Sequence, residues 1–125
     1  MSEPLRGVVV AHGSVAGALV GAAEEISGIR GALVAVSNTG CDRAQLERRL
    51  EEAIGGQAAV IFVDLPSGSC LFAAMRRLPE RKDLRVVSGV NLVMLLEFLF
   101  HRTEPLDAVA HRAAETGAKA IGERG

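Results

Sequence analysis

Short runs of β-branched and apolar residues alternate with amphipathic stretches along the whole chain, and this alternation restricts the fold more than any other feature. Four runs have the continuous apolar character of strands that are buried on both faces of a sheet. They are "GVVVA" (7–11), "ALVAVS" (32–37), "AAVIFVDL" (58–65) and "LRVVSG" (84–89). Because strands that alternate with helices form parallel sheets, we expect an α/β fold. The prediction is a single doubly wound domain over residues 1–125, with a four-stranded parallel sheet and helices on both faces.

Capping residues mark where the intervening helices begin and end. Asp42 and Asn91 are typical N-caps, Gly28 is a typical helix stop, and Pro105 suits the start of the last helix. Apolar residues recur at helical spacing inside these limits. The helices are expected at 14–27, 42–54, 70–78, 91–102 and 106–121.

The composition argues against several classes of protein. The chain has 14 basic and 15 acidic residues, and aromatic residues make up 3% of it, so neither a nucleic-acid binder nor a base-stacking surface is indicated. The two cysteines form no CxxC motif and have no zinc spacing, so we expect no metal centre and no cofactor. The chain also lacks a signal peptide and an apolar stretch long enough to span a bilayer. We therefore expect a cytoplasmic protein with no direct membrane insertion.

Two chemically active side chains follow two of the predicted strands. His12 comes after the first run and Asp64 lies near the end of the third. In a doubly wound sheet, ligands bind at the carboxyl ends of the strands, where the strand order reverses. The residues alone do not determine the strand order, but the order 2-1-3-4 would make strands one and three neighbours. We expect that order, which brings His12 and Asp64 together.

A paired histidine and aspartate can make a nucleophile. A carboxylate that is hydrogen-bonded to one imidazole nitrogen fixes the tautomer and leaves the lone pair of the other nitrogen free to attack. The turn after His12 and the loop "PSGS" (66–69) each precede a helix, where an anion is favoured. His12 and Asp64 are therefore predicted as catalytic residues, with Gly68 and Ser69 stabilising the phosphoryl group of a phosphohistidine. Attack on phosphorus requires a neutral imidazole, so acceptance of the phosphoryl group by His12 should weaken at acidic pH.

Other interpretations of these residues remain open. His12 could be a half-buried histidine that is bonded to the backbone, with Asp64 capping a turn. A hydrolase could use Cys70 or Ser69 as its nucleophile with His12 and Asp64, although the G-x-S-x-G motif is absent. A binding module in which His12 is never phosphorylated is a further alternative.

Charged residues outside this region are expected to be structural. His101 and His111 have no ligand spacing to His12 and are predicted on a solvated helix face. The basic segment "RRLPERKDLR" (76–85) is predicted as a solvated helix end and loop. Cys41 and Asp42 follow the second strand and are candidates for contacts near the site.

Four blocks of the sequence resemble one known family, and together they cover nearly the whole chain. The blocks are "AHGSVAGALVGAAEEISG", "NTGCDRAQLERRLEEAI", "VIFVDLPSGSCLFAA" and "VSGVNLVMLLEFLFHR". They resemble the IIA domain of the mannose family of the phosphoenolpyruvate-dependent sugar phosphotransferase system. The start strand–His–Gly and the phrase "GVN" before apolar helix residues are the most specific parts.

The resemblance implies a function and partners. It implies that the phosphocarrier HPr phosphorylates His12 and that His12 passes the group to a histidine of a IIB protein for sugar uptake. It also implies that Asp64 orients the ring through Nδ1 and leaves Nε2 reactive. The family folds as a four-stranded parallel α/β sheet and commonly forms homodimers.

Three positions depart from the family pattern. Ser67 stands in place of a glycine, and Cys70 and Val93 each stand in place of a proline. The chain ends at Gly125 without an Ala/Pro-rich tether or a IIB domain, so the acceptor is expected to act in trans. These features suggest an alternative function, a stand-alone regulatory protein whose His12 phosphorylation state is sensed by a partner without sugar transport.

Overall fold

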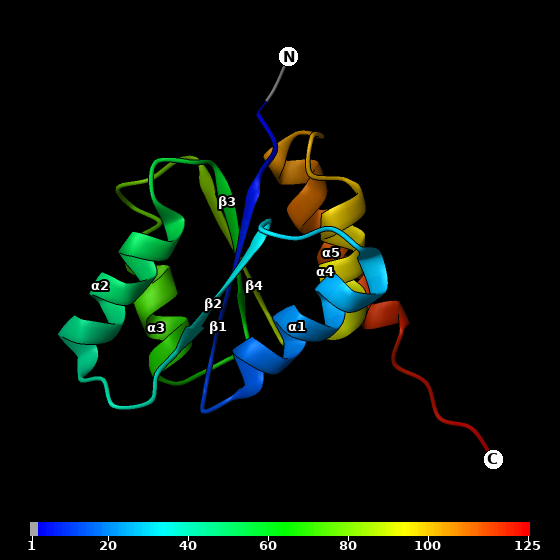
Figure 1. Ribbon diagram of the computed structural model, residues 1–125, viewed down its shortest axis with the longest axis horizontal. Helices are drawn as coiled ribbons and strands as arrows, with labels where there is room; N and C mark the ends of the chain where they lie inside the picture. Colours follow the sequence, from blue (N-terminus) through cyan, green and yellow to red (C-terminus); the bar gives the residue numbers. More distant parts are fainter. Residues whose placement is uncertain (1–2) are drawn as a thin grey trace.

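Four parallel strands form a sheet in the order β2-β1-β3-β4 (Figure 1). The computed structural model describes residues 3–125. The strands are β1 (Arg6–Ala11), β2 (Leu33–Ser37), β3 (Ala59–Val63) and β4 (Leu84–Ser88). The α/β class, the parallel sheet and the strand order that the sequence predicts are confirmed.

Within residues 3–125, five helices cover the two faces of this sheet. They are α1 (Val15–Ser27), α2 (Arg43–Ile54), α3 (Ser69–Met75), α4 (Leu92–Phe100) and α5 (Leu106–Lys119). Helices α2 and α3 lie on one face, and α1, α4 and α5 lie on the other (Figure 1). The helices on both faces are therefore as predicted.

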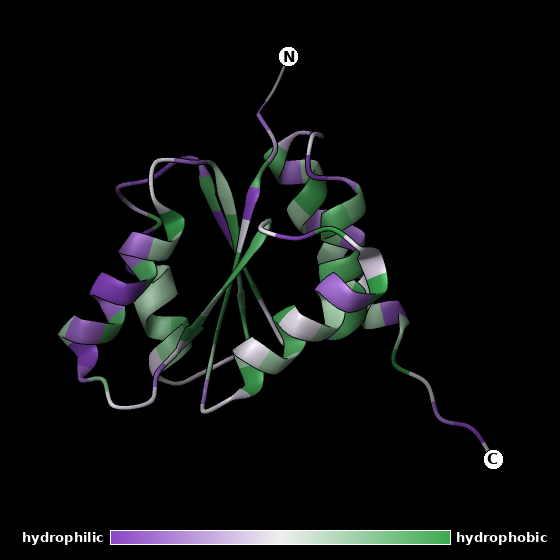
Figure 2. Ribbon diagram, viewed as in Figure 1, coloured by the Kyte–Doolittle hydropathy of each residue, from purple (hydrophilic) through white to green (hydrophobic). Residues whose placement is uncertain are grey.

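Alternate strand residues supply two separate cores, because successive side chains of a strand point to opposite faces. In β1, Val8 and Val10 pack on the side of α2 and α3, whereas Val9 packs on the side of α1, α4 and α5. In the latter core the rings of Phe62 and Phe98 meet edge to face, with centroids 5.5 Å apart. Figure 2 shows apolar strands between the helix layers and hydrophilic residues on the outer side of α2.

The capping signals act as predicted. Asp42 accepts a hydrogen bond from the Gln45 backbone N–H at 2.8 Å, and the Gln45 side chain accepts one from the Asp42 N–H at 2.9 Å. Asn91 accepts one from the Met94 N–H at 3.0 Å. Gly28 ends α1 with φ +75°, a conformation that favours glycine.

Two charged regions are less solvated than the sequence predicts. The Arg77 guanidinium binds Glu47 at 3.0 Å and also pairs with Glu51, so the end of α3 is bound to α2. His101 follows α4 and shares a hydrogen bond of 2.7 Å with Glu104, beside Arg112. The prediction that both late histidines are solvated holds in part for His101, whose side chain is 33% exposed but paired with Glu97 and Glu104. It holds for His111, which is exposed on α5.

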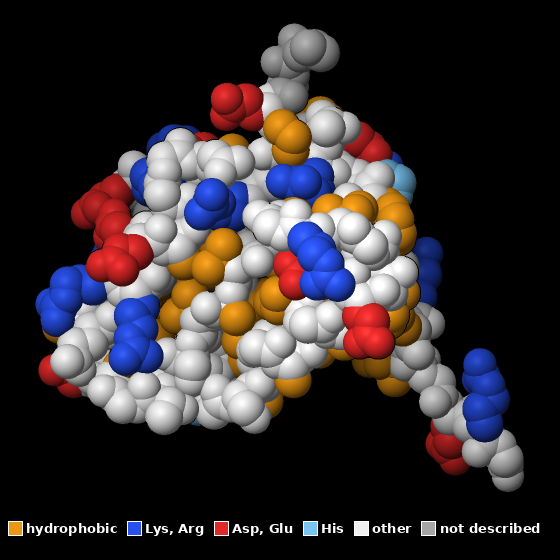
Figure 3. Space-filling model, in the orientation of Figure 1, with side chains coloured by type: hydrophobic (Ala, Val, Ile, Leu, Met, Phe, Trp, Pro, Cys, Tyr) orange, Lys and Arg blue, Asp and Glu red, His pale blue; other side chains and the backbone are white. Residues whose placement is uncertain are grey.

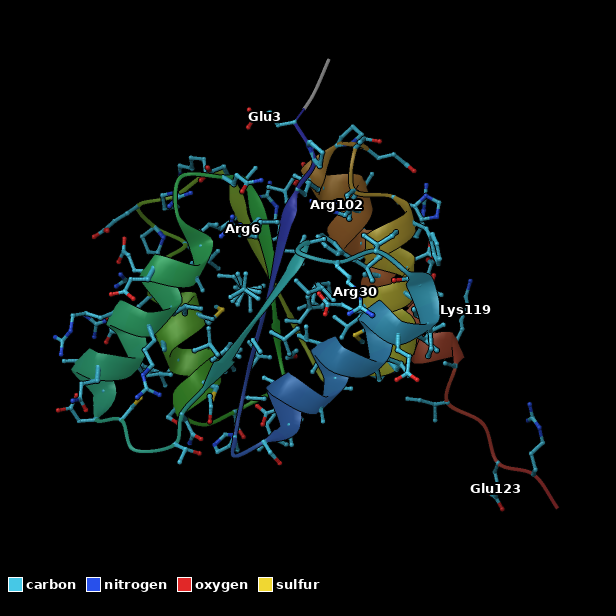
Figure 4. The ribbon with its side chains drawn as sticks, in the orientation of Figure 1. Glu3, Arg6, Arg30, Arg102, Lys119 and Glu123 are labelled. Carbon is cyan, nitrogen blue, oxygen red and sulfur yellow. The ribbon has the colours of Figure 1, made fainter. Side chains whose placement is uncertain are left out.

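At the amino ends of the strands, hydrogen bonds join segments that are far apart in the sequence. The Arg102 side chain donates to the Leu5 carbonyl at 2.9 Å, and the Arg6 side chain donates to the Ala53 carbonyl at 2.9 Å. Figure 4 shows Arg6 and Arg102 at the end of the sheet where the chain begins. The carboxyl ends of the strands therefore form the opposite edge, where loops are left to carry a site.

The surface over the edge strand β2 carries mixed charge. On the face seen in Figure 3, acidic and basic side chains are interspersed, and apolar side chains show between α2 and α1. A mixed surface of this kind does not resemble the basic stripe of a nucleic-acid binder. Among the helices of residues 3–125, none has both the length and the apolar character needed to cross a bilayer.

The close packing of β1 against α4 leads to a stability prediction. A Cβ added at Gly7 would lie 2.5 Å from Leu33 Cδ2 and 2.7 Å from Phe98 Cε2, both in the core. Gly7→Ala should therefore lower the free energy of unfolding by about 1–3 kcal/mol, measured by urea denaturation. Gly21→Ala is the matched control, because nothing lies within 4 Å of its added Cβ. In α1 this change should raise stability by up to about 1 kcal/mol, and equal effects at the two positions would contradict the packing argument.

Candidate functional site

His12 and Asp64 meet at the carboxyl edge of the sheet, one residue beyond β1 and β3. The distance between His12 Nδ1 and Asp64 Oδ2 is 2.8 Å. The His12 backbone N–H donates to the same oxygen at 2.9 Å, and the Leu65 N–H donates to Oδ1 at 3.0 Å. The pairing follows from the register, in which β1 lies directly beside β3. The structure thus brings together the two residues that the sequence singles out.

These hydrogen bonds favour the ionised form of Asp64. Burial alone would raise the pKa of Asp64, but the hydrogen bonds from the His12 backbone and ring, the attraction of the ring and the Leu65 N–H outweigh it and lower the pKa. Asp64 is therefore ionised at neutral pH and accepts the proton of Nδ1. The neutral ring then carries its lone pair on Nε2. Since the His12 side chain is 41% exposed, this nitrogen belongs to a ring that a partner can approach.

Hydrogen bonds from the end of β2 and the loop after it hold the turn that follows His12. The Gly13 N–H donates to Asn38 Oδ1 at 3.2 Å, and Ser37 Oγ donates to the Gly13 carbonyl at 2.7 Å. Gly13 adopts φ +59°, so the turn requires a residue that tolerates the left-handed region. The sequence alone assigns no role to Ser37 and Asn38; the only signal for them is their position where a strand ends.

The loop between β3 and α3 passes beside the imidazole. Gly68 has φ +93°, and a Cβ placed on it would lie 3.9 Å from His12 Cε1, the carbon between the two ring nitrogens. Ser69 begins α3 and lines a hollow of about 290 Å³ with Phe72 and Cys41. Ser67 needs no left-handed conformation, since glycines alone have positive φ within residues 3–125. The serine in place of a family glycine is therefore accommodated without backbone strain.

Cys70 is in contact with the His12 ring. It is fully buried, and its Sγ is 3.8 Å from His12 Nδ1. Burial, with the negative charge of Asp64, raises the pKa of the Cys70 thiol to about 11. A thiol nucleophile must be exposed and ionised, so this arrangement argues against a hydrolase that uses Cys70 as its nucleophile. The contact with Nδ1 has no signature in the sequence, because the two residues are 58 positions apart.

The remaining candidates have structural roles elsewhere or at the margin of the site. Asn91 caps α4 and donates to the Gly117 carbonyl at 3.1 Å. His111 lines a hollow between α5 and β4. Asp42 caps α2, and Cys41 lines the hollow next to Ser69. Cys41 and Asp42 thus remain contact candidates.

Known structures share this fold. The phosphotransferase system component EIIA from Streptococcus agalactiae is 22% identical, with a TM-score of 0.88 over 95% of this chain and 96% of that chain. The mannose/sorbose-specific IIA subunit from Enterococcus faecalis is 22% identical, with a TM-score of 0.86 over 98% and 96% of the two chains. A sigma-54 interaction domain protein from Enterococcus faecalis is 14% identical, with a TM-score of 0.78 over 96% and 95%. At these identities the likeness establishes the fold alone.

The sequence provides the assignment to a family. No functionally curated protein matches it significantly. The model of the EIIA-man family, described as "PTS system fructose IIA component", matches residues 7–114. That match spans most of the chain and includes His12, Asp64 and the loops around them. The protein therefore belongs to the EIIA-man family of IIA components of the sugar phosphotransferase system.

Proposed function

We propose that the protein is a phosphocarrier, in which His12 accepts a phosphoryl group from phospho-HPr and passes it to a separate IIB protein for sugar uptake. The family makes the chain a component of the sugar phosphotransferase system. The observation that carries the specific role is the 2.8 Å hydrogen bond between His12 Nδ1 and Asp64 Oδ2. It makes Nε2 the nucleophilic atom of a half-exposed ring.

The transfer step follows from this tautomer. The Nε2 lone pair attacks phosphorus, and a bond from Nε2 to phosphorus forms as the donor's nitrogen–phosphorus bond breaks. The proton remains on Nδ1, and the ring acquires positive charge. Asp64 lies within hydrogen-bond distance of that charge and stabilises it. Onward transfer reverses the step, with a nucleophile of the IIB protein taking the phosphoryl group.

The loop between β3 and α3 supplies surroundings for the phosphoryl oxygens. Gly68 lies near Cε1, next to Nε2, and lacks a side chain that would obstruct a phosphoryl group there. Ser69 adds a hydroxyl at the start of α3. We assign these two residues to phosphoryl stabilisation because Gly68 lies beside the ring and Ser69 follows it at the start of α3.

A regulatory role is the second candidate. Ser67 and Cys70 change the loop that borders His12 relative to the pattern typical of the family. The fold also occurs in a protein described as a sigma-54 interaction domain protein. In this alternative, a partner senses whether His12 carries a phosphoryl group, and no sugar is transported.

Phosphorylation of the purified chain tests His12 as the acceptor. Incubation with phosphoenolpyruvate, enzyme I and HPr should add one acid-labile phosphoryl group to the chain, measured by intact mass. His12→Ala should abolish the adduct, because the attacking nitrogen is gone. His111→Ala removes an exposed histidine remote from Asp64 and should leave labelling intact. Absence of an adduct where another IIA protein is labelled would refute the proposal.

A second stage separates the two candidate roles. The phosphorylated chain is mixed with purified IIB proteins of the same cell, and both masses are followed. Loss of the adduct from this chain with a matching gain on a IIB protein supports the transport role. An adduct that persists with every IIB protein favours the regulatory one.

The orienting role of Asp64 gives a separate prediction. Asp64→Asn removes the carboxylate that holds the Nδ1 proton, so phosphorylation should slow by about 10- to 100-fold, as with other partners that orient histidines. The rate is measured by quenched-flow mass spectrometry, and circular dichroism checks that the fold is retained. An unchanged rate in a folded variant would show that Asp64 does not orient the ring.

We also propose that the chain works as a homodimer, on the basis of the family resemblance. Strands β2 and β4 are the outer strands of the sheet and leave free edges for association. Light scattering of the purified chain should give twice the monomer mass of 13.1 kDa. A mass equal to the monomer at the concentration used for phosphorylation would contradict the proposal.

A further inference from the structure

Three atoms of kinds that ligate metal ions converge at the Nδ1 edge of the His12 ring. They are His12 Nδ1, a carboxylate oxygen of Asp64 and Sγ of Cys70, and all lie within 4.8 Å of one another. Nδ1 is 2.8 Å from Asp64 Oδ2 and 3.8 Å from Cys70 Sγ. A tetrahedral zinc site with bonds of about 2.0–2.3 Å places its ligand atoms about 3.3–3.6 Å apart. Small side-chain movements therefore convert this cluster into three corners of a tetrahedron.

We propose that His12, Asp64 and Cys70 bind a zinc ion, and that the bound zinc switches off phosphoryl acceptance. A thiolate and an imidazole favour borderline-soft metals such as Zn²⁺, whereas Mg²⁺ and Ca²⁺ prefer oxygen ligands alone. Three protein ligands leave the fourth position to water, as in an open zinc site. The chemistry of the donor set thus selects the metal.

The charges of the site balance when zinc binds. Zn²⁺ replaces the proton of the Cys70 thiol, which leaves to solvent, and bonds form from zinc to Sγ, to Nδ1 and to the Asp64 carboxylate. The imidazole stays neutral, because its proton moves from Nδ1 to Nε2. One thiolate and one carboxylate then neutralise the two positive charges of the ion. A coordinating cation offsets the burial and the negative charge that keep the thiol protonated in its absence.

Access to the site is from the side of the histidine. The His12 side chain is 41% exposed and the Asp64 side chain 14% exposed, whereas Cys70 is fully buried. An ion would enter past the partly exposed His12 ring and Asp64 carboxylate, and the small movement of these side chains opens Nδ1 and Sγ to it. The water ligand would occupy the remaining, solvent-facing position.

The regulatory effect rests on the proposed function and follows from the tautomer. Zinc on Nδ1 uses the lone pair of that nitrogen, so the ring proton lies on Nε2. Nε2 then has no lone pair with which to attack phosphorus, although no ligand covers it.

Cobalt spectroscopy tests the site without any phosphotransfer. Co²⁺ added to the metal-free full chain should bind one ion per chain, with a near-ultraviolet band from thiolate to cobalt and strong visible bands of tetrahedral cobalt. Zn²⁺ should displace the Co²⁺ and remove both sets of bands.

Cys70→Ala should lose the near-ultraviolet band, with Cys70→Ser as the second variant if the first does not fold. Cys41→Ser is the matched control and should keep the band. No band in the wild-type chain, a band that survives in Cys70→Ala, or its loss in Cys41→Ser would overturn the proposal.

Phosphorylation kinetics test the switch. At a free zinc concentration ten times the dissociation constant of the zinc complex, about one chain in 11 is metal-free. The rate at which the wild-type chain is phosphorylated should therefore fall about 11-fold, and a chelator should restore it. Each variant is compared with its own rate in the chelator, and Cys70→Ala should show little further loss with zinc. Equal inhibition of the wild type and Cys70→Ala would mean that zinc acts on another component. If the chain accepts no phosphoryl group even with the chelator, the phosphocarrier role fails, and the cobalt bands still decide whether the metal site exists.

Discussion

The site depends on one carboxylate oxygen that holds both the main chain and the side chain of His12. Asp64 Oδ2 accepts the His12 backbone N–H at 2.9 Å and faces the ring nitrogen Nδ1 at 2.8 Å. Hydrogen bonds to a charged group contribute about 1.5–3 kcal/mol each. The two bonds together set the path of the chain after β1 and the orientation of the ring. The sheet makes them possible, because β1 and β3 are neighbours although their sequences are far apart.

The features that could be predicted from the sequence are those with a local signal or a topological rule behind them. The apolar runs predicted the strands, and Asp42 and Asn91 marked helix starts that the structure confirms. The pairing of His12 with Asp64 required only that strands one and three be adjacent. Helix ends were less accurate; α3, for example, ends at Met75 rather than Leu78, because the chain after it continues in turns.

Contacts between side chains of different elements could not be predicted in this way. Arg77 was expected in solvent but pairs with acidic residues of α2, because the end of α3 lies against that helix. Asn38 Oδ1 accepts a hydrogen bond from the Gly13 N–H, and Cys70 Sγ lies 3.8 Å from His12 Nδ1. Each contact depends on the direction of a side chain across a loop or between layers. Hydropathy periodicity carries no information on such directions.

The division of the interior by the sheet has a consequence for how such a sequence can change over time. Phe98 belongs to the core beneath α1, α4 and α5, whereas Cys70 belongs to the core beneath α2 and α3. Substitutions without shared partners have additive effects on stability. A replacement in the core that contains Cys70 therefore changes the packing of that core and leaves the packing around Phe98 unchanged. Lineages can remodel the loop and helix next to the histidine while the opposite half of the molecule preserves the strand order on which the chemistry relies.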